Sequence, residues 1–224
     1  MNGQANTDLH AFLFHSNHLE MNIKICASVL SIMISVSNLL IADEELTLFS
    51  SSLHEGNQSY TGSLGRVLEI KEKIKVMEIG AFESNPNGPF SIKVAIYDNN
   101  TKDLVSGSKI FSINRENSKW RKQFRFIKIE PLSLSPGSYM LVAQGYNNDQ
   151  QNGNTGLGGS GPGVNGGDCI SVGASAFGAE SISYPNSPDG NVYHAANIVF
   201  VKETESSSDS FKEKTGSSII RRRN

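Results

Sequence analysis

The segment SIKVAIY at residues 91–97 decides the fold class, because its apolar side chains recur with a period of two. Ile92, Val94 and Ile96 occupy alternate positions, and alternate side chains lie on the same face of a β-strand. The sequence DNNT at residues 98–101 follows at once and has the composition of a turn. The pattern therefore predicts a β-strand that ends near Asp98.

Similar short runs recur on both sides of this strand, separated by turn residues. The expected strands are residues 67–70, 74–79, 104–105, 109–113, 120–129, 139–143, 169–172 and 197–201. No stretch after Ala42 keeps the i, i+3, i+4, i+7 apolar spacing of an amphipathic helix. Because a sheet with one apolar face must bury it against another layer, we expect an all-β antiparallel β-sandwich or jelly roll of about eight strands.

The run WRKQFRFIKI at residues 120–129 is the longest of these expected strands. It is rich in aromatic and β-branched residues and is followed by Glu130 and Pro131. Since proline cannot donate a hydrogen bond to a β-ladder, the strand is expected to end there.

The length and charge of the chain limit the classes of protein to consider. The chain has 224 residues, which favours one domain with tails over two very small domains. Its 20 Lys and Arg against 22 Asp and Glu argue against nucleic acid as a partner. Of two cysteines, Cys26 falls in the expected leader described next, so Cys169 has no partner for an intrachain disulfide.

Residues 21–42, MNIKICASVLSIMISVSNLLIA, are typical of a secretory signal peptide. A single lysine, Lys24, precedes an uncharged apolar stretch, a small residue (Ala42) occupies the expected cleavage point, and acidic residues follow. An uncleaved membrane anchor and a buried core helix are the alternatives. The sequence therefore predicts a hydrophobic signal helix and a secreted, extracellular or periplasmic protein that meets the membrane only through this transient segment.

Residues 1–20 contain Asp8, Glu20 and three histidines, which is unlike the positive start of a signal peptide. Either Met21 is the true initiator or the leader has a long polar start. Both readings make residues 1–20 a non-structural extension.

The exported part divides by composition. Residues 43–64 are a polar lead-in, and residues 65–201 carry the strand pattern of the β-domain. Residues 145–167 form a glycine- and asparagine-rich loop, which we expect to be mobile without a ligand. Residues 202–224 are rich in Ser, Lys and Glu and predict a disordered tail.

Four segments resemble an uncharacterised β-sandwich domain of bacterial secreted and surface proteins. They are TGSLGRVLEI (61–70), VMEIGAFESNPNG (76–88), KVAIYDNNTKDLVSG (93–107) and FRFIKIEPLSLSPGSYMLVAQGY (124–146). These are strand and turn motifs, so the resemblance implies a fold and no chemistry. Many such domains precede a C-terminal sorting anchor of Pro-Glu-Pro, an apolar helix and arginines. This chain has only the arginines, which favours a freely secreted or periplasmic product or another means of surface attachment.

No catalytic arrangement is recognisable in the exported part. The nucleophile pattern G-x-S-x-G is absent, and the G-x-G-x-x-G at residues 156–161 is not followed by a predicted helix. Acidic residues are scattered along the chain, so the sequence nominates no pair for glycoside hydrolysis. We therefore expect a non-catalytic protein, with an extracellular carbohydrate-active enzyme of unidentified carboxylates as the alternative.

Aromatic and basic residues suggest a ligand. Carbohydrates pack on exposed aromatic rings, and the candidates near predicted strand ends or loops are Trp120, Tyr146, Tyr184 and Tyr193. Burial in the core is the alternative role for each. The one basic cluster comprises Arg115, Lys119, Arg121, Lys122, Arg125 and Lys128. Within it Arg121 and Arg125 are candidate ligands of an anionic polysaccharide; the alternative is that the cluster deters edge-to-edge strand pairing.

Calcium is the only cofactor that the sequence suggests. Asn147, Asp149 and Asp168 flank the glycine-rich loop and offer the oxygen ligands that calcium prefers. Their spacing does not match an EF-hand, and solvated turn residues are the alternative. Taken together, the sequence favours a secreted, non-catalytic module for extracellular binding or surface structure, directed to a polysaccharide or another surface component.

Overall fold

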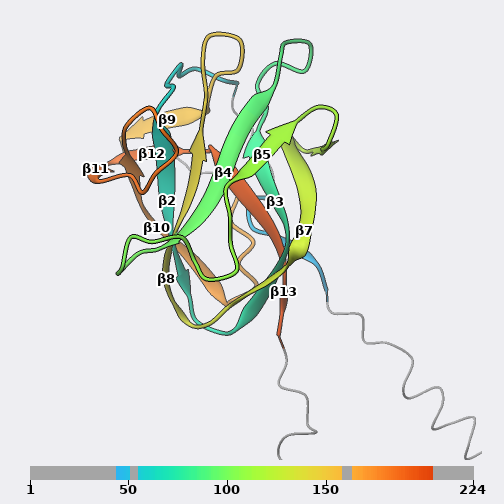
Figure 1. Cartoon of the computed structure of the whole chain (residues 1–224), viewed down its shortest axis with the longest axis vertical. Coiled ribbons are helices and arrows are strands. Elements are labelled where there is room, and N and C mark those ends of the chain that lie inside the picture. Colours follow the sequence, from blue (N-terminus) through green and yellow to red (C-terminus); the bar gives the residue numbers. More distant parts are fainter. Residues whose placement is uncertain (1–43, 51–54, 158–162, 204–224) are drawn as a thin grey trace, which may run out of the picture. The chain divides into compact units, whose positions relative to one another are not determined.

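The computed structural model describes residues 44–50, 55–157 and 163–203, all within the unit that spans residues 43–224. In these residues every regular element is a β-strand, and no helix is long or apolar enough to cross a membrane (Figure 1). The expected signal helix, the expected N-terminal extension and nearly all of the expected tail lie outside the described residues.

Two large antiparallel sheets and a two-stranded ribbon make up the described domain (Figure 1). The first has five strands in the order β1 (Leu46–Thr47), β13 (Ala196–Lys202), β3 (Ile74–Phe82), β7 (Phe124–Leu134) and β6 (Lys119–Arg121). The second has six strands in the order β11 (Ser187–Asp189), β10 (Ile170–Phe177), β2 (Ser63–Ile70), β8 (Gly137–Gln144), β4 (Ser91–Asp98) and β5 (Phe111–Asn114). A two-stranded ribbon pairs β12 (Asn191–Tyr193) with β9 (Asn154–Leu157). The predicted all-β antiparallel fold is confirmed.

Alternation within the strands separates two clusters of buried side chains. In β4, Ile92, Val94 and Ile96 join the main core, whereas Ala95 and Tyr97 join a smaller cluster. Strands of both sheets contribute to the main core; their largest fully buried side chains include Phe82, Phe124, Phe200, Leu64 and Leu68. Burial of these side chains drives folding, because moving each one out of water stabilises the folded state by about 1.5–3 kcal/mol.

The run at residues 120–129 is two strands, which corrects the expectation of one. A two-residue turn, Lys122–Gln123, joins β6 to β7, and its residues have φ angles of 47° and 68°. Such primed turns match the twist of a hairpin, but they usually contain asparagine or glycine because other residues are strained at positive φ. The sequence therefore carried no turn signal at this point.

Proline does not end β7, contrary to expectation. The strand continues through Pro131 to Leu134, and its pairing with β3 shifts register between Val76 and Glu78. Prolines are tolerated at such bulges because the irregular ladder leaves a position that needs no amide donor. Strand β9 likewise lies inside the segment expected to be a loop and pairs with β12.

We predict that Lys122→Asn stabilises the domain by about 0.5–1 kcal/mol, because asparagine tolerates the left-handed region better than lysine. The free energy of unfolding from chemical denaturation measures the gain. Lys71→Asn makes the same chemical change at an exposed residue without positive φ and should bring no gain. An equal gain in both variants would show that the strain at Lys122 is not the cause.

Candidate functional site

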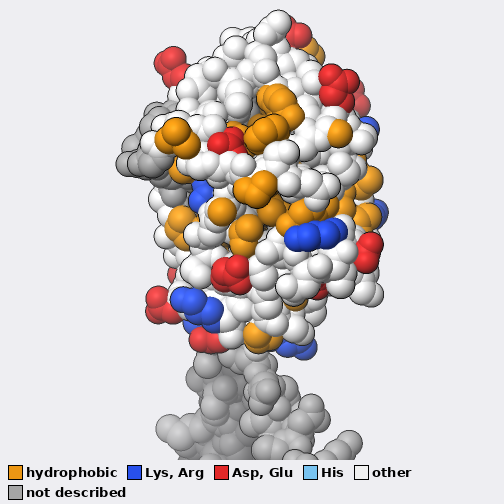
Figure 2. Space-filling view, turned by 90° about the vertical axis from the view of Figure 1, so that its left-hand side faces the viewer, with side chains coloured by type: hydrophobic (Ala, Val, Ile, Leu, Met, Phe, Trp, Pro, Cys, Tyr) orange, Lys and Arg blue, Asp and Glu red, His pale blue; other side chains and the backbone are white. Residues whose placement is uncertain are grey.

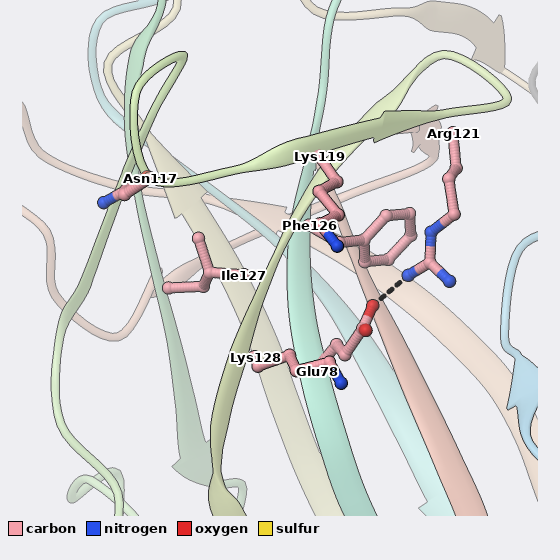
Figure 3. Close-up of a pocket in the computed structure, with 7 residues that line it drawn as sticks. All are labelled: Glu78, Asn117, Lys119, Arg121, Phe126, Ile127 and Lys128. Atoms are coloured by element: carbon pink, nitrogen blue, oxygen red, sulfur yellow. Dashed lines mark hydrogen bonds and ion pairs between the residues drawn. The ribbon is translucent and has the colours of Figure 1, made fainter.

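An open pocket of about 520 Å³ lies where β3, β7 and β6 meet. The residues that line it are Glu78, Asn117, Lys119, Arg121, Phe126, Ile127 and Lys128 (Figure 3). They come from two adjacent strands, the edge strand β6 and the turn before it. Regular strands therefore hold most of the pocket wall.

Strand register brings the charged residues to one face of the sheet. Lys119 stands opposite Phe126, and Glu78 stands opposite Lys128. Directly paired residues share a face, and successive residues of a strand alternate between faces. Arg121 therefore lies on the same face as Lys119, whereas Trp120 does not.

Arg121 is held in place by two contacts (Figure 3). Its guanidinium forms an ion pair with the carboxylate of Glu78 and lies over the ring of Phe126, 4.4 Å from the ring centroid. The Phe126 side chain is buried against Gly80, where an added Cβ would stand 2.5 Å from the ring. The buried Phe126 ring thus holds the Arg121 guanidinium in place, so this planar cation is ordered before a ligand binds.

The pocket carries a net positive charge. Three cations, Lys119, Arg121 and Lys128, face the single carboxylate of Glu78 among the residues that line it. The ammonium groups of Lys119 and Lys128 make no ion pair or hydrogen bond with other residues in the described part of the chain. Both lysines are exposed, so they are available to an anion. The pocket suits carboxylate or sulfate groups, which charged donors bind most strongly.

Two other members of the basic cluster form ion pairs with one buried acid. Glu83 has a fully buried side chain, and its Oε1 lies 2.8 Å from Nε of Arg125 and 2.7 Å from Nη2 of Arg115. Arg115 also donates to the carbonyl oxygens of Asn85 and Gly88, at 2.8 and 2.9 Å. Arg115 and Arg125 therefore hold the loop after β3 to the start of β7, and Arg125 is not free to bind a ligand as the sequence suggested.

The four aromatic candidates do not converge on one site. Tyr146 is fully buried, and its hydroxyl donates to the carbonyl oxygens of Ala195 and Phe82, so it serves the core. Burial raises the pKa of Tyr146 far above its ordinary value. Tyr193 is also buried, Tyr184 is half-buried, and Trp120 is 54% exposed on the face opposite Arg121.

The three calcium candidates are dispersed as well. The Oδ1 of Asn147 accepts hydrogen bonds from the backbone amides of Asp149 and Gln150, so this oxygen serves a turn. Asp168 lies elsewhere, with a φ of 62°, in a shallow pocket with Glu44. No group of three or more His, Cys, Asp or Glu among the described residues is placed to hold a metal ion.

Long-range pairing explains what the sequence missed. Glu78 and Glu83 lie in or after β3, far from the basic run, and only the β3–β7 register reveals which cations they meet. The two-residue spacing of Lys119 and Arg121 was the available signal, because it places both on one face. Comparison with protein-family models finds no match, and the same holds for the search of curated proteins.

We predict that Glu83→Gln lowers the free energy of unfolding by about 2–3 kcal/mol, because it leaves two partly buried guanidinium groups without their carboxylate. Chemical denaturation measures the loss. Glu72→Gln is the control: Glu72 lies 3.6 Å from Lys202 with 60% of its side chain exposed, and should cost less than about 0.5 kcal/mol. A similar small effect in both variants would contradict the structural role of Glu83.

Proposed function

We propose that this chain is a secreted, non-catalytic β-sandwich module that binds an anionic polysaccharide through the pocket between β3, β7 and β6. One observation carries the proposal: three cations converge on a pocket that contains one carboxylate, and two of those cations have no partner among the described residues. An ordered cationic site of this kind lowers the free energy of a bound polyanion more than that of a neutral polymer.

The arrangement of the cations favours acidic sugars. The guanidinium of Arg121 is planar and fixed, and such a fork matches the geometry of a carboxylate or sulfate. Lys119 on β6 and Lys128 on β7 are flexible point charges on the same face of the sheet and can follow the repeat of a charged polymer. We therefore expect carboxylated or sulfated chains to bind, and uncharged chains of similar size to bind far more weakly.

Export and the two-layer fold are further parts of the proposal. The hydrophobic segment at residues 21–42 supports secretion, and the strand motifs resemble those of bacterial secreted domains. The contribution of both sheets to one main core supports a β-sandwich.

Hydrolysis of a polysaccharide is the less favoured function. Hydrolysis of a glycosidic bond commonly needs two carboxyl groups on either side of the bond. Among the residues that line this pocket, only Glu78 has a carboxylate, and Arg121 pairs with it. Binding is thus the function that these groups support best.

We predict that Lys119→Gln/Lys128→Gln weakens binding of polygalacturonate or dextran sulfate about 10-fold, because two exposed charge pairs contribute up to about 1 kcal/mol each. Affinity electrophoresis and calorimetry of the purified protein measure this, with dextran as the neutral polymer. Binding by the unaltered protein should also fall as salt is raised from 0.05 to about 0.3 M, as screening requires.

The control is Lys71→Gln/Lys93→Gln, which removes the same charge at two exposed lysines outside the pocket. It should leave the affinity within about 2-fold of the unaltered protein. Equal losses in both double variants would mean that overall charge, rather than this pocket, attracts the polymer. Equal binding of dextran, or no binding of either polyanion, would overturn the proposal; in the latter case the charges on edge strand β6 serve to block strand pairing.

A further inference from the structure

A second pocket lies on the other sheet, beside β2, β10, β11 and β12. It has a volume of about 180 Å³ and is lined by Gln58, Tyr60, Leu64, Phe177, Asp189, Asn191 and Tyr193. In Figure 1, β11 and β12 stand at the left of the domain and β7 at the right. Figure 2 looks onto the left-hand side, where apolar side chains gather and charged ones are few. This pocket is therefore separate in place and chemistry from the cationic one.

Aromatic side chains form the apolar part of this second pocket. The rings of Tyr60 and Phe177 meet edge to face, with centroids 6.1 Å apart. The Tyr60 hydroxyl donates to the carbonyl oxygen of Gly178 at 2.6 Å, which fixes this ring. Phe177 is 37% exposed and offers a surface for an apolar ligand face.

A carboxylate and two amides form the polar part. Asp189 accepts hydrogen bonds from the Tyr193 hydroxyl and from the side-chain and backbone nitrogens of Asn191. A carboxylate has about four acceptor positions, and these four hydrogen bonds occupy them, so Asp189 orders this end of the pocket. The hydrogen bond from Tyr193 lowers the pKa of Asp189, which keeps this acceptor ionised. Gln58 uses its Oε1 to accept from Asn152, and its amide donors have no partner among the described residues.

Buried polar groups without hydrogen-bond partners lie on the same face of the second sheet, among the paired residues next to the pocket. Asp189 pairs with Ser175, and Ser175 pairs with Arg66 across β11, β10 and β2. The neighbouring row on that face contains Phe177 and Leu64, which line the pocket. Nε and Nη1 of Arg66 and Oγ of Ser175 are buried without a hydrogen-bond partner in the described part of the chain. Arg66 and Ser175 do not line the pocket, so their contribution to it is the positive charge of the Arg66 guanidinium behind its wall.

We propose that this second pocket binds one ring of a neutral sugar. The ligand needs an apolar face for Phe177 and a hydroxyl oxygen that accepts from the side-chain amide of Gln58. The negative Asp189 opposes an anionic ligand, and the positive Arg66 opposes a cationic one. A pyranose ring combines these properties, and the cavity is smaller than the roughly 300–1,000 Å³ of pockets for drug-sized ligands, which suits a single ring. This inference does not depend on the proposed binding of polyanions.

The test is a titration of the ¹⁵N-labelled protein with methyl glycosides of glucose, galactose and mannose, followed by amide chemical shifts. We expect at least one neutral glycoside to give saturable shifts centred on β11 and β12, with a millimolar dissociation constant. Phe177→Leu keeps apolar bulk but removes the ring, and should weaken this binding about 5-fold. Trp120→Ala, at the exposed aromatic residue of β6, is the matched control and should leave it unchanged.

Three results would overturn the inference. They are the absence of saturable shifts with every neutral glycoside, unchanged affinity in Phe177→Leu, and tighter binding of glucuronate than of the neutral sugars. The Lys119→Gln/Lys128→Gln variant separates the two proposals, since it should keep neutral-sugar binding and lose polyanion binding. Phe177→Leu should do the reverse.

Discussion

Burial of apolar side chains in two sheets is the constraint on which the rest of the domain depends. The period of two in a strand means that a slip of one residue would exchange the faces of every side chain. Packing of Phe124 and Phe126 into the main core therefore fixes the position of their neighbours. Because Lys119 and Arg121 pair in register with those phenylalanines, core packing also determines which cations gather in the pocket. The chemistry of this site is thus set by hydrophobic register rather than by attraction among the charges.

The buried Glu83 determines how much of the basic cluster is free. Its carboxylate forms ion pairs with Arg115 and Arg125, and Arg115 in turn holds the backbone of the loop after β3. Transfer of charges from water into a protein is costly unless they are paired, so this arrangement is stable only as a set. Among the described residues, the charges of Lys119 and Lys128 have no ion-pair partner, although all four residues look equivalent in the sequence. The basic segment thus contains two arginines that hold the fold together and two lysines that remain on the surface.

The sequence was informative wherever local pattern controls structure. The strand at residues 91–97 and the runs that became β2, β3, β8, β10 and β13 all show alternation or β-branched enrichment, so their existence could be predicted. The turn at Lys122–Gln123 could not, because its strained residues are not those that primed turns prefer. Strands β9, β11 and β12 are short and rich in Asn, Gly, Ser and Pro, which are typical of loops. The pairing of Glu83 with two arginines depends on long-range register, which no local pattern encodes.

The two pockets differ in the kind of recognition that they support. The first has unpaired cations on an open surface, so its attraction acts over a distance near the Debye length and weakens with salt. The second is smaller and combines aromatic walls with a single carboxylate, so it requires close fit and is insensitive to salt by comparison. Since the pockets belong to different sheets, occupation of one leaves the other exposed.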